Sequence, residues 1–429
     1  MAAKPTKAWR YAVGMFGTSI PINIFKTYAS IFYVDRMGMP IKHYSLTLLI
    51  YTFIDALDNP VYGFLSDRTR TKWGRRRPWL IVGAPALALL LIGFFSPPNI
   101  PNIILYFLPM YVLTGTIDSL INANYAPLFP ELFKTQRERS HTNSMRQAFQ
   151  LLAMIISIAL TPIVTGAIGY QTTAIIYGLL GGAVIIFSAL GCHENPDYNE
   201  MAKPRMWDSI LSIAKNKHFW IAGIATAFYS AAMSLVMSAM PFYAKYALNI
   251  SSVQTSILFA TVLVVSIAFI WVWSRFLNKY EVVKVWRLAL MFLGLAYLPL
   301  YFAGSFMWAV AAGAILAVGY GGVLATNDLI GARIIDEDAS KYNQRREGIY
   351  SSVGGFLNRL NGLFTSLAFF LVSIIFGYES GDNPGANPAS ATRFLLALFP
   401  FILMILSAVF AMLLNFDDGS TQEHEQEHS

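Results

Sequence analysis

The sequence predicts an all-α polytopic membrane protein that crosses the bilayer twelve times. Of its 429 residues, 55% are hydrophobic and 13% are Asp, Glu, Lys or Arg, which is about half the charged fraction of a soluble domain. Twelve spans of about 20 residues require about 240 apolar residues, close to what the chain contains. A soluble enzyme and a disordered chain are therefore poor fits, and the single cysteine, Cys192, excludes an internal disulfide.

Long apolar runs place the twelve spans in order along the chain. In the first half they lie at 9–34, 43–66, 79–97, 102–129, 143–168 and 171–192. In the second half they lie at 218–247, 252–274, 285–303, 306–330, 347–377 and 390–415. The long polar break at 193–217 predicts a linker between a bundle over 1–192 and a bundle with a polar tail over 218–429. Two halves of six spans are the outline of a transporter.

The distribution of positive charge predicts the orientation. Most of the 31 lysines and arginines precede the first span or follow even-numbered spans, whereas Arg36, Lys42, Lys245 and Arg393 lie on the opposite side. Cytoplasmic loops carry the excess of Lys and Arg, so we expect both termini in the cytoplasm and the protein in the cell inner membrane. The net charge of +7 then needs no nucleic-acid partner, and the tail at 421–429 is a solvated segment, not a metal site.

Six ionisable residues fall inside the predicted spans. Such a residue costs several kcal/mol at the bilayer centre, so it normally faces a partner, a water-filled cavity or an ion path. These six are therefore the first candidates for function: Lys26, Asp55, Asp58, Asp118, Arg146 and Arg359.

Asp55 and Asp58 lie three residues apart and share one face of the second span. Two carboxylates in one site resist joint ionisation unless a cation lies between them. The pair is therefore a candidate site for a coupling proton or Na⁺. The alternative is a clamp between helices, in which the acids pair with Lys26 or Arg146.

Ser19, Asn23 and Lys26 share one face of the first span, which predicts a substrate-facing polar stripe. In the alternative, Lys26 extends toward the membrane interface. Arg359 follows Gly354-Gly355 by about one turn, and these glycines predict a close approach of another helix.

The fourth span carries a second polar stripe. Asp118, Asn122 and Tyr125 follow one another at spacings of four and three residues and so share one face. The stripe predicts substrate contacts, and hydrogen bonding between helices is the alternative.

The loop between the second and third spans is strongly basic and predicts a tight cytoplasmic turn. Asp67 can cap a helix or pair with a guanidinium, Gly74 permits close packing, and Pro78 suits the start of the next helix. We therefore expect gating contacts from Asp67, Arg68, Gly74, Arg75 and Arg76.

The string from Asp55 to Trp79 resembles the glycoside–pentoside–hexuronide:cation symporters, the melibiose-permease-like branch of the major facilitator superfamily. Two further segments agree in order and place, Pro130-Glu131-Leu132 with Arg137-Glu138-Arg139, and Arg346-Glu347-Gly348-Ile349-Tyr350. The resemblance covers essentially the whole chain. It implies two six-helix bundles, alternating access and symport of a sugar or glycoside with H⁺ or Na⁺, by a monomer that needs no other cofactor.

The resemblance also implies a cation site. Asp55 matches the first cation-site acid of the family, and Ser119 falls where the melibiose permease supplies a threonine. The second acid of the family directly precedes a proline, whereas here Asn59 holds that position and the acid is Asp58. This shift disfavours the usual sodium geometry, so proton coupling is preferred.

The implied sugar site departs further from the family. Arg146 matches an arginine near the sugar, Arg359 replaces a lysine, and two acids of the melibiose permease are replaced by Ser19 and Asn122. A more positive pocket suits a carboxylate or sulfonate, so a neutral glycoside and an anionic sugar such as a hexuronide both stay open. The expected substrate-binding residues are Ser19, Asn23, Lys26, Asn122, Tyr125, Arg146 and Arg359.

Two other functions compete with that of a sugar symporter. A lysolipid or amphiphile carrier of the same fold is the alternative, since sequence does not exclude an apolar slot. A membrane-embedded enzyme is disfavoured, because no long loop and no cluster of catalytic nucleophiles or metal ligands appears. We therefore predict a transporter and not an enzyme.

Overall fold

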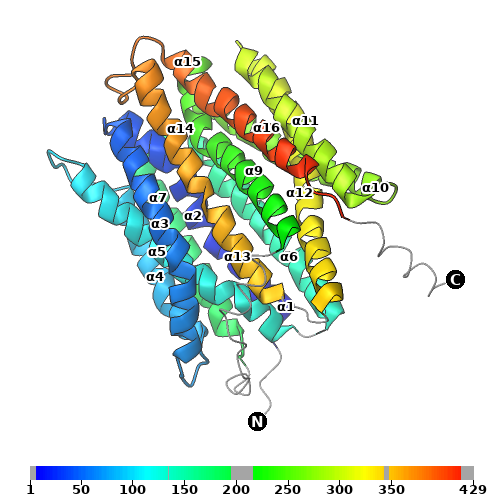
Figure 1. Cartoon of the computed structure of the whole chain (residues 1–429). Coiled ribbons are helices and arrows are strands. Elements are labelled where there is room, and N and C mark those ends of the chain that lie inside the picture. Colours follow the sequence, from blue (N-terminus) through cyan, green and yellow to red (C-terminus); the bar gives the residue numbers. More distant parts are fainter. Residues whose placement is uncertain (1–5, 134, 195–215, 343–346, 417–429) are drawn as a thin grey trace.

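The computed structural model describes residues 6–133, 135–194, 216–342 and 347–416, and helices dominate this part of the chain (Figure 1). The predicted all-α class is confirmed. In the first half the helical elements are α1 (Ala8–Ala12), α2 (Gly14–Ser30), the π-helical turn η1 (Ile31–Arg36), α3 (Ile41–Arg68), α4 (Arg77–Phe94), α5 (Ile104–Leu132), α6 (Gln136–Met154), the π-helical turn η2 (Ile155–Ala159) and α7 (Thr161–Gly191).

The second half repeats the pattern of long helices joined by short turns. Its elements are α9 (Lys217–Phe242), the π-helical turn η4 (Tyr243–Ala247), α10 (Ser252–Leu277), α11 (Val282–Phe302), α12 (Phe306–Tyr342), α13 (Glu347–Arg359), α14 (Asn361–Phe376), α15 (Pro388–Arg393), the π-helical turn η5 (Phe394–Leu398) and α16 (Phe399–Met412).

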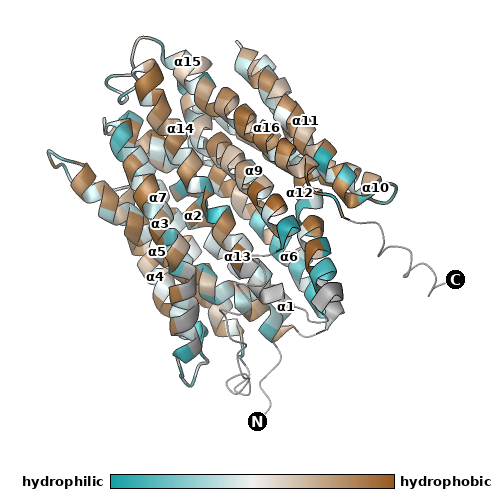
Figure 2. Cartoon of the chain, in the orientation of Figure 1, coloured by the Kyte–Doolittle hydropathy of each residue, from teal (hydrophilic) through white to brown (hydrophobic). Residues whose placement is uncertain are grey.

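Within the described residues, all twelve predicted ranges contain helix, and nine helices are long and apolar enough to cross a membrane. Figure 2 shows hydrophobic residues along most of the helices and many hydrophilic residues at their ends. The spans that do not reach this apolar threshold are built from α2, α3 and α6. They carry Lys26, the Asp55–Asp58 pair and Arg146, so the candidate functional residues themselves lower the hydropathy.

Local sequence explains two of the helix boundaries. Gly169 separates the fifth and sixth predicted spans, and its φ of +79° is a conformation that glycine adopts at little cost. Pro78 lies in the first turn of α4, as predicted, where a missing N–H costs no intrahelical hydrogen bond.

The predicted close approach at Gly354-Gly355 is wrong. A Cβ at Gly355 would meet nothing within 4 Å, and a Cβ at Gly354 would only reach the Phe219 ring at 4.0 Å. The close approach is instead at Gly362, where a Cβ would overlap the side chain of Thr52 on α3. Gly362 therefore lets α14 of the second half contact α3 of the first half.

The two halves are hydrogen-bonded near the end of the bundle that holds α15, which we call the α15 end (Figure 1). The opposite end, which holds α1, is called the α1 end. Lys245 Nζ of η4 lies 2.6 Å from Asp35 Oδ2 of η1, and the Tyr246 hydroxyl donates to the same carboxylate. Further bonds join Ser30 to Ser238 O, Ile41 N–H to Glu379 O, Gly381 N–H to Val34 O, and Ser45 to Ser366. The bundle is closed at the α15 end.

Candidate functional site

Five charged side chains from four helices act electrostatically on one another in the interior. Asp58 is influenced by Asp55 and Arg359, and Asp118 is influenced by Lys26, Asp55 and Arg359. They come from α2, α3, α5 and α13. We call these five residues the central cluster. The structure thus brings together most of the ionisable residues that the sequence analysis placed inside the spans.

Asp55 is the best-bonded member of the central cluster. Its Oδ1 accepts hydrogen bonds from Ser119 Oγ at 2.8 Å and from the Tyr51 hydroxyl at 3.1 Å. The guanidinium of Arg359 forms an ion pair with the same oxygen, and its Nη1 lies 2.5 Å from the main-chain O of Asp55. The clamp alternative named Lys26 or Arg146 as the partner of the acids, whereas the ion pair of Asp55 is with Arg359.

A break in the eleventh predicted span positions Arg359. Helix α13 ends at Arg359, Leu360 interrupts the helix, and α14 starts at Asn361. A cation in the last turn of a helix interacts favourably with the helix dipole. Interrupted helices also expose backbone groups near the substrate sites of transporters.

Asp58 lies one turn further along α3 and does not share the bonds of Asp55. It is buried, with 8% of its surface exposed, and it faces Thr116 of α5. Within the described residues, neither Asp58 Oδ2 nor Thr116 Oγ1 has a hydrogen-bond partner. Buried polar atoms are normally satisfied, so this pair has unused bonding capacity. The side chains of Asn59 and Asp67 lie outside the described part of the structure.

Asp118 and Asn122 form the polar stripe on α5. Asn122 Nδ2 lies 2.9 Å from Asp118 Oδ1 and 3.1 Å from Asp118 O. Asp118 is buried, whereas Lys26, which acts on it from α2, is exposed between buried neighbours on its helix. The hydrogen bonds of this stripe therefore lie within α5 itself.

Ser19 and Asn23 lie on the same helix as Lys26 but have different surroundings. Ser19 is buried. Asn23 Nδ2 donates to Ser157 Oγ of η2 at 3.0 Å and so joins the first and fifth spans.

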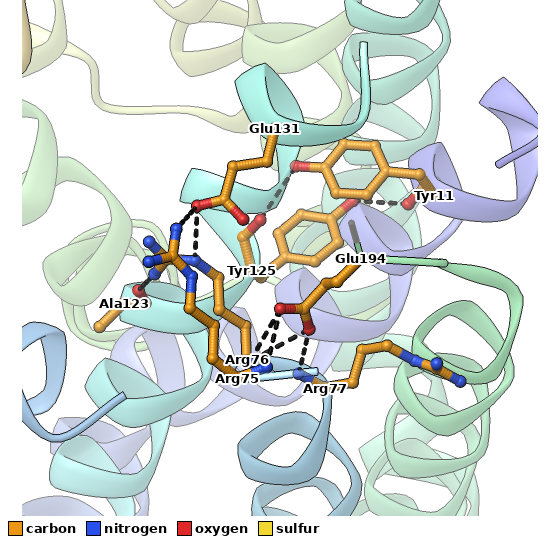
Figure 3. A network of polar contacts seen from close by, with 8 residues as sticks. All are labelled: Tyr11, Arg75, Arg76, Arg77, Ala123, Tyr125, Glu131 and Glu194. Atoms are coloured by element: carbon orange, nitrogen blue, oxygen red, sulfur yellow. Dashed lines mark hydrogen bonds and ion pairs between the residues drawn. The ribbon is translucent and has the colours of Figure 1, made fainter. Parts of the chain in front are cut away.

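Tyr125 and Arg146 belong to an aromatic group near the α1 end. The rings of Tyr11 and Tyr125 are stacked with centroids 4.7 Å apart, and each hydroxyl donates to the main-chain O of the other residue (Figure 3). The guanidinium of Arg146 lies 5.0 Å from the Phe129 ring centroid, and its buried Nε has no hydrogen-bond partner within the described chain. Neither residue contributes a hydrogen bond or ion pair to the central cluster in the described structure.

The basic loop between α3 and α4 binds the carboxylate of Glu194, which lies just after the sixth predicted span. The carboxylate of Glu194 accepts hydrogen bonds from the main-chain N–H groups of Arg75 at 2.9 Å, Arg76 at 3.1 Å and Arg77 at 2.9 Å (Figure 3). Gly74 has a φ of +104°, and a Cβ there would lie 2.5 Å from the carboxyl carbon of Glu194. We call this arrangement the Glu194 cradle.

The predicted loop residues are split between the cradle and an ion-pair group. The side chains of Arg75 and Arg76 reach Glu131 Oε1 of α5 at 2.5 and 3.0 Å. Arg68 is exposed at the end of α3. The acid of the cradle was missed by the sequence analysis, because Glu194 falls in the polar break that was assigned to the linker.

The second half contributes neutral polar side chains that the sequence analysis also missed. Thr226 donates to Asn327 at 3.0 Å, and Ser230 donates to Asn358 at 2.6 Å, directly beside Arg359. Their signal in the sequence is an asparagine inside each of the tenth and eleventh predicted spans, which carries no charge to mark it.

Comparison with known proteins identifies relatives across the whole chain. A family model described as MFS/sugar transport protein matches residues 10–418. An uncharacterized symporter of Bacillus subtilis is 24% identical over 438 residues, which cover 95% of this chain and 91% of that protein. An uncharacterized symporter of Synechocystis is 30% identical over 198 residues, 43% of this chain and 36% of that protein. A putative sulfoquinovose importer of Salmonella typhimurium is 24% identical over 258 residues, 56% of this chain and 53% of its own.

Two solved structures share the fold. The nucleoside transporter NupG matches with a TM-score of 0.73 at 11% identity, covering 95% of this chain and 100% of that one. A bacterial homologue of the human lysosomal transporter Spinster matches with a TM-score of 0.69 at 12% identity, covering 95% of this chain and 97% of that one. At such identities the likeness establishes the fold alone.

Proposed function

The chain belongs to the MFS/sugar transport protein family, and from this premise we propose that it carries a sugar or glycoside together with one monovalent cation by alternating access. The family match confirms the resemblance drawn from the loop motifs, and the protein is a transporter and not an enzyme. In the proposal the protein is a monomer in the cell inner membrane, with both termini and the α1 end in the cytoplasm.

The charge balance of the central cluster supports coupling to a cation. Three carboxylates, those of Asp55, Asp58 and Asp118, face two basic groups, those of Lys26 and Arg359. With every group ionised the cluster carries one uncompensated negative charge, which is costly inside a membrane. One monovalent cation neutralises it, and so links cation binding to the conformations in which the cluster is buried.

The bonding around the acids favours a proton over Na⁺. The Oδ1 atom of Asp55 already accepts hydrogen bonds from Ser119 and Tyr51 and forms an ion pair with Arg359. Asp58, by contrast, is buried and its Oδ2 has no hydrogen-bond partner within the described residues, so a proton would remove a charge that is poorly compensated there. Sodium needs several oxygen ligands arranged around it. With the second acid at Asp58 instead of at position 59, the two acids are less well placed to provide them. Asp58 is therefore the proton carrier of the proposal.

The substrate of the proposal is a sugar whose charge is open. A relative named as a putative sulfoquinovose importer and the exposed ammonium group of Lys26 both support including anionic sugars. The neutral pairs Thr226–Asn327 and Ser230–Asn358 offer hydrogen bonds suited to sugar hydroxyls.

Uptake into proteoliposomes tests the function. A panel of labelled neutral glycosides, a hexuronide and sulfoquinovose is offered under imposed proton or sodium gradients. We expect accumulation of at least one sugar under an inward proton gradient without Na⁺, and its loss with a protonophore. Accumulation driven by sodium at fixed pH would replace the proton with Na⁺, and uptake of lysolipid but of no sugar would overturn the proposal.

Asp58→Asn tests the assigned carrier, because it removes the proton site and retains the shape of the side chain. Accumulation under a proton gradient should disappear, while exchange of labelled for unlabelled sugar continues. Asp382→Asn is the matched control, since it makes the same chemical change at an exposed acid outside the central cluster. Accumulation by Asp58→Asn at the level of the native protein would remove Asp58 from this role.

A further inference from the structure

A cavity of about 250 Å³ lies between the two halves at the α15 end, outside the central cluster. The first half supplies Tyr28 of α2 and Thr165 and Tyr170 of α7. The second half supplies Lys245 of η4, Asn249, and Ser252 and Thr255 of α10. We propose that this outer cavity binds a neutral, monosaccharide-sized polyol from the extracellular side, and that its occupancy holds the α15 end closed. The proposal rests on the proposed function.

Of the residues that line the outer cavity, Lys245 is the one charged group, and the guanidinium of Arg36 lies outside the lining, 5.6 Å from the Tyr170 ring centroid. The hydroxyls of Thr165 and Thr255 donate to the main-chain O atoms of Thr161 at 2.8 Å and Ser251 at 2.9 Å, so their oxygens retain accepting capacity toward a ligand. The ammonium group of Lys245 is paired with Asp35 at 2.6 Å. A neutral ligand rich in hydroxyl groups matches this lining better than an anion.

Asn249 is the most unusual residue of the lining. Among the described non-glycine residues it alone has a positive φ, of 50°, because it caps the C-terminal end of η4, where Ile250 N–H donates to Ala244 O at 3.0 Å. Its side-chain amide makes no hydrogen bond to another described residue. Both its donors and its acceptor are therefore available to a ligand in the cavity.

The size and the walls of the outer cavity restrict the ligand further. Its volume is slightly below the roughly 300 Å³ at which sites for small molecules begin, so a single sugar ring is favoured over a disaccharide. The rings of Tyr28 and Tyr170, with centroids 6.4 Å apart, and the prolines 162 and 241 give it an apolar wall. Sugar rings present both C–H faces and hydroxyl edges, and the lining offers a partner for each.

Occupancy of the outer cavity has a conformational consequence. The cavity needs residues from both halves, so it is lost when the halves separate at this end. A ligand that binds only the closed state shifts the equilibrium toward that state. At about ten times its Kd it favours the closed over the open state by about elevenfold. External sugar at high concentration should then slow its own uptake.

The test follows the reactivity of a cysteine introduced at Ser252, at the edge of the cavity, in the full-length protein in nanodiscs. The probes are D-xylose, D-glucose and D-galactose, with D-glucuronate as the charged comparison. At least one neutral sugar should slow labelling by a thiol reagent by about tenfold at saturation, and D-glucuronate should not. Cysteine labelling in nanodiscs needs no ion gradient and no transport. A protein that fails to transport sugar can therefore still show protection at Ser252, and a protein that transports sugar can lack it.

Two variants separate the outer cavity from the central cluster. Asn249→Gly removes the amide and tolerates the positive φ, so protection of the cysteine should be lost. In Lys26→Gln, which changes the central cluster, protection should persist. Absence of protection by every neutral sugar, stronger protection by D-glucuronate, or protection that is lost in Lys26→Gln and retained in Asn249→Gly would each overturn the proposal.

Discussion

Asp55 receives its hydrogen bonds from Tyr51 and Ser119 of the first half, whereas its ion pair comes from Arg359 of the second. A charged contact between the halves must break whenever they separate at this depth. The Asp55 carboxylate is thus already occupied by Arg359. Breaking an ion pair that is largely shielded from water leaves a charge uncompensated, so the charge of Asp55 is energetically linked to the contact between the halves.

The first prediction is that Asp55→Asn uncouples transport. The amide retains the size of the side chain but removes one of the three carboxylates, so the central cluster no longer carries the extra negative charge that a proton on Asp58 would neutralise. Gradient-driven accumulation should fall by about tenfold or more, equivalent to about 1.4 kcal/mol of coupling. Counterflow of sugar in proteoliposomes should persist.

Two further variants give the control. Asp382→Asn changes an exposed acid near the α15 end by the same chemistry and should leave accumulation unchanged. Arg359→Gln in combination with Asp55→Asn removes the guanidinium that has lost its ion-pair partner and should restore thermal stability. Accumulation by Asp55→Asn equal to that of Asp382→Asn would refute the linkage.

Cys192 is buried, with 1% of its surface exposed, directly after α7. Burial raises the pKa of its thiol to about 12, since a thiolate is poorly solvated there, and the nearby Arg77 offsets only part of this effect. The thiolate is the reactive form. At neutral pH the native chain therefore holds almost no reactive cysteine.

The second prediction is that maleimide does not label the folded native protein at neutral pH. Labelling should be complete after denaturation in detergent, and it should accelerate in the folded protein only as the pH rises toward 12. Mass spectrometry of the intact chain measures the adduct. Rapid labelling of the folded protein at neutral pH would show that Cys192 is accessible, and cysteine variants would then need a cysteine-free background.

At the scale of elements, the Glu194 cradle joins the start of the predicted linker to the turn before α4. The first N–H groups of a helix have no intrahelical partner. Here one carboxylate accepts from Arg77, the first residue of α4, and from Arg75 and Arg76 directly before it. The main-chain N–H of His193 also donates to Thr6 at 2.9 Å. The described segment that ends at residue 194 is thus held to the first half.

The third prediction is that Gly74→Ala and Glu194→Gln destabilise the same unit. A Cβ at Gly74 meets the Glu194 carboxylate and strains a positive φ, at a cost of about 1–3 kcal/mol. Glu194→Gln weakens hydrogen bonds to a charged acceptor, at about 1–3 kcal/mol. Because both act through one contact, the double variant should lose about 1 kcal/mol less than the sum, by thermal or denaturant unfolding of the purified protein.

Glu379→Gln is the matched control for this cycle. Its carboxylate is exposed and accepts one hydrogen bond, from Asn383 at 2.8 Å. The same chemical change should therefore alter stability by less than about 0.5 kcal/mol. Strict additivity of the two cradle variants would mean that Gly74 and Glu194 act independently.

At the scale of the whole molecule, the closed α15 end and the charge distribution together indicate which side of the membrane the closed end faces. The predicted extracellular side carries few Lys and Arg residues, and the hydrogen bonds and ion pair described between Val34–Asp35 and the second half lie there. If the α1 end is cytoplasmic, the structure is closed toward the outside.

The fourth prediction is therefore topological. Cysteines introduced at Asn99, near the α15 end, and at Gln136, at the start of α6, should label differently in intact cells. A membrane-impermeant thiol reagent added outside should label position 99 and leave position 136 unlabelled until the membrane is permeabilised. The unreactive Cys192 serves as the internal background. Labelling of position 136 from outside would invert the assignment.

The sequence by itself determined the helical membrane class, the order of the spans and the ionisable residues that lie within them. These follow from local quantities, because the length of an apolar run and the presence of a carboxylate within it do not depend on the neighbours. The Gly169 corner and the start of α4 at Pro78 were predictable for the same reason, since both depend on the backbone preferences of single residues.

Only the tertiary structure decided which groups meet. Arg359 rather than Lys26 or Arg146 pairs with Asp55, Tyr125 stacks on Tyr11, and Glu194 fills the turn before α4. The outer cavity likewise consists of residues from both halves. Side chains three or four residues apart on one helix are neighbours by geometry. Contacts between helices depend instead on how whole surfaces pack, as when Gly362 lets α14 approach α3, and no spacing along the chain encodes that distance.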